Sequence, residues 1–177
     1  MEVGVGRASQ EEQYKLVAAE FGAALERLAR AYEADPDHRR DLLQEVHLAL
    51  WRSFASFDGR CSVRTWTYRV AHNVGASHVL KRRRLRPERL TSLEEIAEAP
   101  DSDNPETVAG ERQVMARLMA LIQALAPPDR QVMLLYLEDL DAAAIGEITG
   151  LSSGSVAVKI HRLKDVLARR FQQGGAA

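Results

Sequence analysis

The sequence contains a single cysteine, Cys61, which excludes an intramolecular disulfide and is typical of a reducing cytoplasm. It has no apolar run of about 18 residues, so neither a transmembrane helix nor membrane insertion is expected. Its N-terminal segment lacks a basic stretch followed by an apolar block, so no signal peptide is expected. These absences predict a cytoplasmic protein.

Alternating apolar and polar residues, the pattern of β-strands, are scarce, while alanine and leucine dominate the 46% of hydrophobic residues. We therefore expect an all-α fold. Breaks at Pro87 and in the segment that follows it divide the chain into two small helical domains, 13–86 and 108–173, joined by a flexible linker over 87–107. Helical periods predict helices over 13–34, 38–54, 64–84, 108–125, 130–136 and 142–149, and a helix-turn-helix over 140–171.

Charge is segregated along the chain, although the net charge is only -1. Five basic side chains lie within residues 81–86, whereas residues 87–108 contain seven acidic side chains against one Arg89. The basic run fits a nucleic-acid contact, and it equally fits a solvated helix end favoured by the helix dipole. The linker is expected to be acidic and extended.

The spacing of the histidines gives no metal site. His38 and His47 are nine residues apart and His72 and His78 are six apart, so neither pair lies on one helix face as metal ligands do. The sequence also lacks HExxH, CxxC, a glycine-rich phosphate loop and GxSxG. We therefore expect no metal, no cofactor, no catalytic residue and no enzyme activity.

Segment 38–54 predicts a helix with one apolar and one polar face. The polar face carries Asp41, Gln44, Glu45 and Arg52 around one large apolar residue, Leu48. A leucine flanked by carboxylates and an amide is typical of a protein-docking face. A solvated helix with one exposed leucine gives the same pattern, so the residues alone leave both interpretations open. The opposite face, expected in the core, holds Leu42, Leu43, Val46, Ala49, Leu50 and Ser53.

Segment 64–84 predicts a helix that starts with aromatic residues and ends with basic ones. Trp66 and Tyr68 fit stacking surfaces for unpaired bases, although one of the two also fits a core position. Arginine holds phosphates, and asparagine and histidine hydrogen-bond to base edges. The face expected to do so holds Arg69, His72, Asn73, Ala76 and Leu80, while the residues expected to pack inward are Val70, Ala71, Val74 and His78.

The segment from Ala142 to Val156 has the layout of a helix-turn-helix. Gly150 is placed for the left-handed residue that ends the first helix, and Ser152 for the N-cap of the second. The buried stripe of the second helix is expected to be Val156, Ile160, Leu163 and Leu167. The side chains expected to face a major groove are Ala157, Val158, His161 and Arg162, with Lys159 and Lys164 at the flanks.

The two halves together resemble bacterial sigma factors of the extracytoplasmic-function (ECF) class, in the sigma-70 family. The resemblance covers about residues 20–86 and 108–171. Its specific parts are the motif 41–45 (Asp-Leu-Leu-Gln-Glu), the block 65–73, the basic run 81–84 and the hairpin 148–162. It implies a sigma2-like helical bundle and a sigma4-like helix-turn-helix, joined by the acidic linker.

The resemblance also implies a function and its partners. Such proteins bind core RNA polymerase through its clamp coiled coil and flap, recognise the −10 and −35 promoter elements, open the promoter and initiate transcription of a specialised regulon. They perform no catalysis and are usually held inactive by an anti-sigma factor. The linker would thread the RNA-exit path.

Residue by residue, the resemblance implies three binding sets. The set that binds core polymerase is Asp41, Gln44, Glu45 and Leu48. The set that binds the −10 element, together with the loop 57–64, is Trp66, Arg69, His72, Asn73, Ser77, Lys81, Arg82 and Arg84, with Asn73 near a flipped base. The set that binds the −35 element is Ser155, Ala157, Val158, Lys159, His161, Arg162 and Lys164.

Two positions depart from the family pattern. Residues 38–40 (His-Arg-Arg) precede Asp41 where an acidic stretch is common, which puts the strength of core docking in doubt. Ala157 and Ser155 stand where a basic residue and a threonine are usual, which leaves the −35 preference open. Two alternatives remain. One, in the same class, is a stand-alone helix-turn-helix regulator, which needs neither the polar face around Leu48 nor the acidic linker. The other, from another class, is a helical interaction protein, against which the block 65–73 argues.

Overall fold

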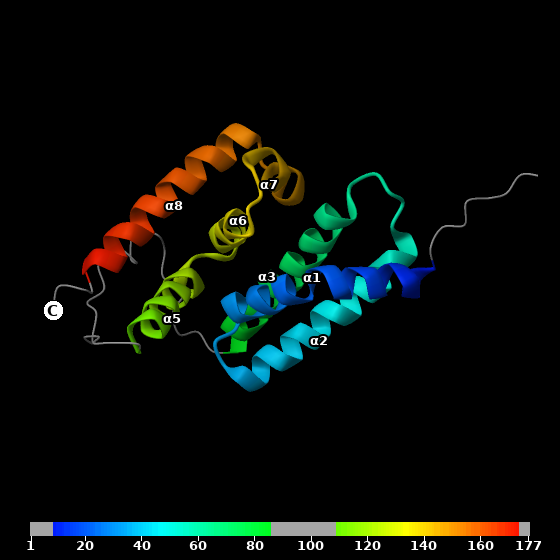
Figure 1. Cartoon of the computed structure of the whole chain (residues 1–177), viewed down its shortest axis with the longest axis horizontal. Coiled ribbons are helices and arrows are strands. Elements are labelled where there is room, and N and C mark those ends of the chain that lie inside the picture. The colour runs from blue at the N-terminus through cyan, green and yellow to red at the C-terminus, as the bar shows by residue number, and fades with distance from the viewer. Residues whose placement is uncertain (1–8, 86–108, 174–177) are drawn as a thin grey trace, which may run out of the picture.

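The computed structural model describes residues 9–85 and 109–173, and within them the chain forms helices and no strand (Figure 1). The first group of helices is α1 (Gln10–Tyr32), α2 (Pro36–Ser53), the short 3-10 helix η1 (Phe54–Ser56) and α3 (Val63–Leu85). The second is α5 (Ala109–Ala124), α6 (Pro127–Leu137), α7 (Ala142–Thr149) and α8 (Ser153–Gln173). The all-α prediction is confirmed, and the linker predicted over 87–107 lies outside the described residues.

Local capping explains where the helices start. Helix α1 begins three residues before the predicted 13 because Ser9 and Glu12 form a reciprocal capping box. Helix α2 begins at Pro36, and the Asp35 carboxylate accepts hydrogen bonds from the N–H groups of Asp37 and His38. Helix α6 begins at Pro127 rather than at 130, because a proline in the first turn gives up no hydrogen bond. The apparent break in the sequence is therefore a helix start.

The first three long helices pack on one another, with α3 against both α1 and α2. Their core includes Leu25, Leu42, Val46 and Leu50, all fully buried. Helix α3 approaches α1 so closely that a Cβ on Gly75 would lie 2.7 Å from the ring of Tyr32. A larger residue at position 75 would therefore separate the two helices.

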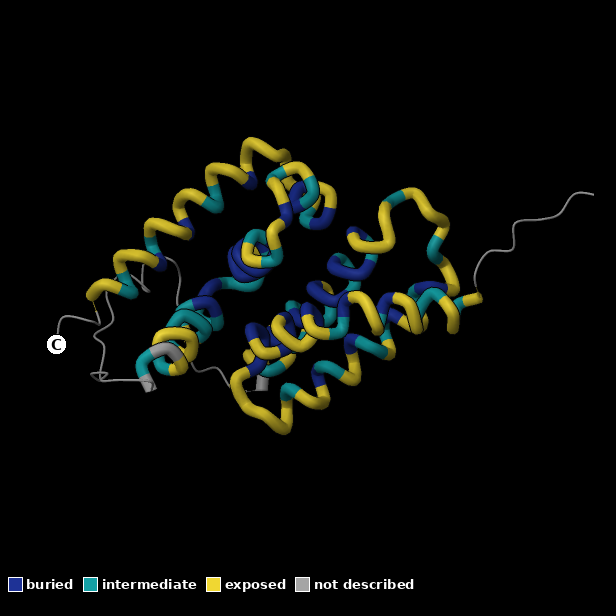
Figure 2. The backbone as a smooth tube through the Cα atoms, in the orientation of Figure 1, coloured by how far each residue is buried: buried dark blue, intermediate teal, exposed yellow. Residues whose placement is uncertain are grey.

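The second group is built around α6, whose residues Val132, Met133, Leu134 and Leu135 are buried. Helices α7 and α8 form the predicted helix-turn-helix. Gly150 adopts φ 78° at the end of α7, and the Ser152 Oγ accepts a hydrogen bond from the N–H of Ser155 at the start of α8, as the sequence predicted. Helix α8 buries Val156, Leu163 and Leu167 and presents its other side to solvent (Figure 2).

The two groups pack against each other, α1 and α3 against α5, α6 and α7, and their buried apolar side chains form one cluster. Figure 1 shows α6 and α7 beside α1 and α3, while α8 lies on the outer side. The outer face of α8 is therefore exposed, whereas the start of α3 faces the second group.

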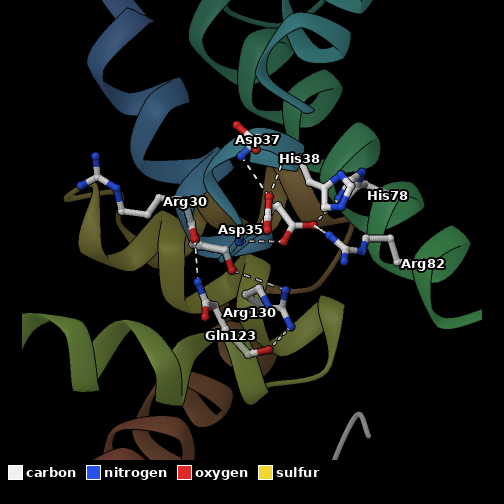
Figure 3. A network of polar contacts seen from close by, with 10 residues as sticks. Arg30, Asp35, Asp37, His38, His78, Arg82, Gln123 and Arg130 are labelled. Atoms are coloured by element: carbon white, nitrogen blue, oxygen red, sulfur yellow. Dashed lines mark hydrogen bonds and ion pairs between the residues drawn. The ribbon is translucent and has the colours of Figure 1, made fainter. Parts of the chain in front are cut away.

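A buried arginine, Arg130, connects the two helix groups through hydrogen bonds (Figure 3). Its guanidinium donates hydrogen bonds to the carbonyl oxygens of Gln123 and Leu125 in its own group and, at 3.4 Å, to that of Ala31 in α1. It also lies 5.2 Å from the centre of the Tyr32 ring. Gln123 adds a hydrogen bond of 2.8 Å to the carbonyl oxygen of Arg30. Arg130 therefore satisfies carbonyls at the C-terminal ends of two helices, one from each group.

Candidate nucleic-acid interface

The polar face predicted on α2 is exposed. Asp41, Gln44 and Glu45 are exposed, and Leu48 leaves 47% of its surface in solvent. The opposite side of the helix buries Leu42, Val46 and Leu50. The helix thus presents carboxylates and an amide around one apolar side chain, which is a surface suited to a protein partner.

This face continues into a shallow groove between α2 and α3. The groove has a volume of about 410 Å³ and is lined by Glu45, Leu48, Ala49, Arg52, Asn73, Val74 and Ser77. Asn73 and Ser77 are exposed there. The structure therefore brings Asn73, expected at a flipped base, next to residues expected at the polymerase. The sequence prediction assigns Asn73 to the −10 element and Glu45 and Leu48 to the polymerase, as two separate binding sets.

The start of α3 and the loop 57–62 surround a larger polar hollow. Its volume is about 930 Å³, and it is lined by Ser56, Asp58, Gly59, Arg60, Cys61, Ser62, Trp66, Arg69 and Glu147. Trp66 is partly buried: its indole N–H donates to the Ser53 hydroxyl at 2.9 Å, and its ring lies 5.3 Å from that of Phe57. Tyr68 is buried, so it is the core aromatic of the two. Trp66 remains at the rim of this hollow and offers a surface for stacking with a base, while Arg60 and Arg69 in the lining are accompanied by two acids, Asp58 and Glu147.

The expected base contact of His72 does not fit the structure. Its side chain is 1% exposed, its ring hydrogen-bonds with the Tyr32 hydroxyl at 3.0 Å, and burial lowers its pKa to about 3. The buried residues of α3 include Tyr68, Ala71, His72, Gly75 and Val79. Of the set predicted to pack inward only Ala71 is buried, while Val70, Val74 and His78 are partly buried. Helix α3 is contacted by other helices on more than one side, so its buried part extends to His72, whereas Asn73 is exposed as predicted.

The basic end of α3 is partly engaged within the fold (Figure 3). Lys81 and Arg84 are exposed, whereas Arg82 pairs with the carboxylate of Glu33, which also contacts His78 at 2.8 Å. Burial opposes ionisation of Glu33, but hydrogen bonds from His78, the Asp35 N–H and Arg82 hold its pKa below the usual value. Among the described residues, Lys81 and Arg84 are thus the cations at this end of α3 that are exposed and can meet phosphates together with Arg83, while Arg82 is held by Glu33.

Helix α8 exposes nearly all of the set predicted for it. Ser155, Ala157, Val158, His161, Arg162 and Lys164 are exposed. Lys159 is only partly exposed because its ammonium pairs with the Asp129 carboxylate at the start of α6. The Lys164 ammonium lies 5.4 Å from the centre of the Tyr136 ring. The exposed set forms one continuous face, as insertion of a helix into a major groove requires.

The sequence did not predict the polar contacts that join the two helix groups. Arg27 donates two hydrogen bonds, of 2.6 and 2.7 Å, to the Glu138 carboxylate, and Arg64 donates to the Glu138 carbonyl oxygen at 3.1 Å. Arg69 donates to the Glu147 carbonyl oxygen at 2.5 Å, and the Thr65 hydroxyl donates to the Glu147 carboxylate at 3.4 Å. No local pattern signals these contacts, because the partners are far apart in the sequence.

Two features are absent from the described parts of the chain. No group of three or more His, Cys, Asp or Glu side chains lies close enough there to hold a metal ion. None of the described helices has both the length and the apolar character needed to cross a bilayer.

Comparison with known proteins gives two family matches. Residues 18–85 match the family model described as Sigma-70 region 2, and residues 115–167 match that described as Sigma-70, region 4. Together these matches cover more than half of the chain. The first contains α2 and α3, and the second contains most of the helix-turn-helix module.

Individual relatives agree with these matches. The chain is 31% identical over 153 residues to the ECF RNA polymerase sigma factor SigE of Mycolicibacterium smegmatis, an alignment of 83% of this chain and 58% of that protein. It is 28% identical to SigG of Mycobacterium tuberculosis (72% of this chain, 40% of that protein) and 26% identical to SigW of Bacillus subtilis (82% and 79%). The chain thus spans about half the length of the first two relatives.

Two solved structures share the fold. CnrH, in complex with the cytosolic domain of CnrY, superposes with a TM-score of 0.66 at 21% identity, covering 93% of this chain and 90% of that one. RpoE of Bartonella quintana, in complex with the anti-sigma factor NepR, gives a TM-score of 0.65 at 17% identity, covering 90% and 96%. At these identities the likeness concerns the fold alone. The two regional matches, in this order and on these helices, show that the chain belongs to the sigma-70 family, in its extracytoplasmic-function class.

Proposed function

We propose that this chain is a bacterial RNA polymerase sigma factor of the cytoplasm. It binds core polymerase, recognises the −10 and −35 elements, opens the promoter and initiates transcription of a specialised regulon. The observation that carries the proposal is that three differently composed exposed surfaces occur in one chain, on α2, at the start of α3 and on α8. A stand-alone DNA-binding protein has no use for the first of them.

The face of α2 is the proposed site for the clamp coiled coil of core polymerase. Asp41, Gln44 and Glu45 surround Leu48, whose exposed side chain is suited to burial against a partner helix. Charged rim residues of this kind steer association, while the apolar centre loses its water on binding. Residues 38–40 (His-Arg-Arg) precede this face where an acidic stretch is usual in the family, and Arg40 pairs with Asp37.

The start of α3 and the loop 57–62 are the proposed reader of the −10 element. Trp66 offers a stacking surface at the rim of the polar hollow. The positively charged Arg60 and Arg69 would meet phosphates there after leaving their contacts with Asp58 and Glu147. Lys81 and Arg84 extend this charge along α3. Exposed Asn73 supplies amide groups for a displaced base. His72 has no place in this set because it is buried.

Helix α8 is the proposed reader of the −35 element. Its exposed face contains Ser155, Ala157, Val158, His161, Arg162 and Lys164. The functional units we propose are 13–86 for polymerase and the −10 element and 108–173 for the −35 element and the polymerase flap, with 87–107 as the acidic connection. No residue is assigned a catalytic role, because transcription chemistry belongs to the polymerase.

An anti-sigma factor is a proposed further partner. CnrH was solved with the cytosolic domain of CnrY, and RpoE was solved with the anti-sigma factor NepR. The apolar groove between α2 and α3 borders the proposed polymerase site. A protein bound there would exclude polymerase by direct overlap.

The test is run-off transcription with bacterial core polymerase and this chain on a pool of genomic promoter fragments. Discrete new start sites that require the chain are expected, and their upstream sequences give the −10 and −35 preferences. Failure to bind core polymerase would overturn the proposal and favour the stand-alone regulator. Stable binding without any transcription would restrict the proposal to the docking step.

A further inference from the structure

The centre of the exposed face of α8 is apolar. Val158 leaves 63% of its surface in solvent, and its neighbour Ala157 is also exposed. Polar and charged side chains lie on either side, at Ser155, His161 and Arg162. A β-branched residue on a solvated helix surface has a lower helix propensity than alanine and gains nothing from packing there. Single exposed apolar residues are common on proteins, so the position of Val158 in the middle of the proposed reading face is the informative point.

The surroundings of Val158 form a hollow. Its volume is about 420 Å³, and it is lined by Asp129, Gly154, Ser155, Val158, Lys159, Arg162 and Leu163. Gly154 lies one turn before Val158 and has no side chain to cover it. A Cβ built there would meet nothing within 4 Å. The valine methyl groups are therefore open to a partner that approaches the helix face.

The cationic side chain next to Val158 in the sequence, Lys159, already forms an ion pair within the protein. The Lys159 ammonium pairs with the Asp129 carboxylate across the hollow. This pairing leaves Ser155 and Arg162 as the exposed hydrogen-bonding side chains that flank Val158 on its own face. The centre of the face consequently offers apolar contact instead of a hydrogen bond.

Only one base presents an apolar group in the major groove, the 5-methyl group of thymine. Because α8 is the helix proposed to enter that groove, we propose that Val158 reads the 5-methyl group of one thymine, on either strand of the −35 element. This inference rests on the proposed function and adds a specificity-determining residue to it. It also gives a use to an apolar pair, Ala157 and Val158, at the centre of a DNA-binding surface.

The expected size of the effect follows from the burial of one methyl group. Such burial contributes about 0.8 kcal/mol, which corresponds to about a fourfold change in affinity. The thymine is thus expected to be a distinct preference within the −35 element, not its strongest determinant.

The experiment uses holoenzyme assembled from bacterial core polymerase and the full chain. Duplexes randomised upstream of a fixed −10 region are selected for binding. Each thymine of the selected −35 element is then replaced singly by deoxyuridine, which lacks only the 5-methyl group. One replacement is expected to reduce the affinity of wild-type holoenzyme about fourfold. With Val158→Ala the same replacement is expected to have no effect, while folding is preserved because the position is exposed and alanine favours helix.

The matched control is Val114→Ala, the same substitution at a valine on α5 that is 45% exposed. It is expected to keep the full response to deoxyuridine. If no thymine is sensitive, or if the sensitivity is the same in Val158→Ala, the inference is overturned while the proposed function stands. If holoenzyme selects no upstream sequence at all, the proposed function of α8 fails first and the inference fails with it.

Discussion

Arg69 of α3 donates a hydrogen bond to the carbonyl oxygen of Glu147 in α7 at 2.5 Å, which joins the two proposed DNA-reading modules. The carboxylate of the same Glu147 accepts from Thr65 at 3.4 Å and lines the polar hollow beside Trp66. An acidic group therefore lies where a phosphate would meet Arg69. The packed arrangement and DNA binding compete for the same side chain, so the chain without polymerase is expected to bind promoter duplex weakly.

A charge reversal at the neighbouring ion pair tests this competition. Glu138→Arg removes both hydrogen bonds from Arg27 and places like charges together. The separated arrangement of the helix groups is expected to become more populated, which raises the average radius of gyration measured by small-angle X-ray scattering. The affinity of the free chain for promoter duplex is expected to rise about fivefold at low salt, since an ion pair open to solvent contributes up to about 1 kcal/mol.

The control for this reversal is Glu20→Arg, which makes the same change of charge at an exposed position of α1. This variant measures how much the affinity for promoter duplex rises from the added positive charge alone. An unchanged radius of gyration in Glu138→Arg, or equal gains in the two variants, would contradict the competition.

The sequence predicted those features whose physical cause is local. Gly150 and Ser152 mark the turn and the second start of the helix-turn-helix because a left-handed residue and an N-cap each depend on one residue type. The exposed and buried sides of α2 also followed from its period, because that helix packs on one side and its opposite face remains open.

The features that the sequence did not predict depend on contacts between distant segments. Helix α3 is contacted by α1, α2, α6 and α7, so its apolar pattern does not define one inward face, and His72 was misplaced for this reason. Arg130 reads as an ordinary surface cation, yet it is buried among carbonyl oxygens of two helix ends. Nothing near Arg130 in the sequence indicates that Ala31 lies beside it.

The face of α2 predicts the effect of Leu48→Arg. An arginine at this exposed position is expected to weaken binding to core polymerase at least tenfold, because it replaces the apolar centre of the contact with a charge. Binding is measured with labelled core polymerase, and circular dichroism checks the fold. Asp41→Arg is expected to act in the same direction through the rim.

Leu16→Arg is the matched control for Leu48→Arg, since Leu16 on α1 is 67% exposed and lies outside the proposed site. It is expected to leave polymerase binding and folding unchanged. Equal losses from the two variants would remove α2 from the docking assignment.

Asn73 lies where it could contact either a displaced base or core polymerase, and a substitution can distinguish these two roles. Asn73→Ala is expected to reduce promoter opening, measured by permanganate reactivity of −10 thymines, about tenfold while closed-complex binding changes less than twofold. The reason is that a base loses its Watson–Crick partner only when the duplex opens, so the Asn73 amide can replace that partner only in the open complex. Asn73 also lines the groove beside Glu45 and Leu48. If the variant instead loses affinity for core polymerase, Asn73 belongs to the docking face.

The buried His72 predicts how stability depends on pH. Burial lowers its pKa from 6.5 to about 3, so below pH 6.5 the unfolded chain takes up a proton that the folded chain refuses. The free energy of unfolding is therefore expected to fall as the pH decreases from 6.5, by up to about 1.4 kcal/mol per pH unit from this group. Burial also lowers the pKa of His47, which adds a loss of the same sign.

The pH effect is assigned with His72→Gln, whose amide retains a partner for the Tyr32 hydroxyl. Between pH 7.5 and 5.5, wild type is expected to lose about 1 kcal/mol more stability than this variant in urea titrations. The control is His161→Gln, at an exposed position of α8 that is expected to keep the wild-type loss. An identical pH dependence in wild type and His72→Gln would mean that His72 accepts a proton in the folded chain. Burial would then not keep the ring neutral, and the packing of α3 on Tyr32 would have to open as the pH falls.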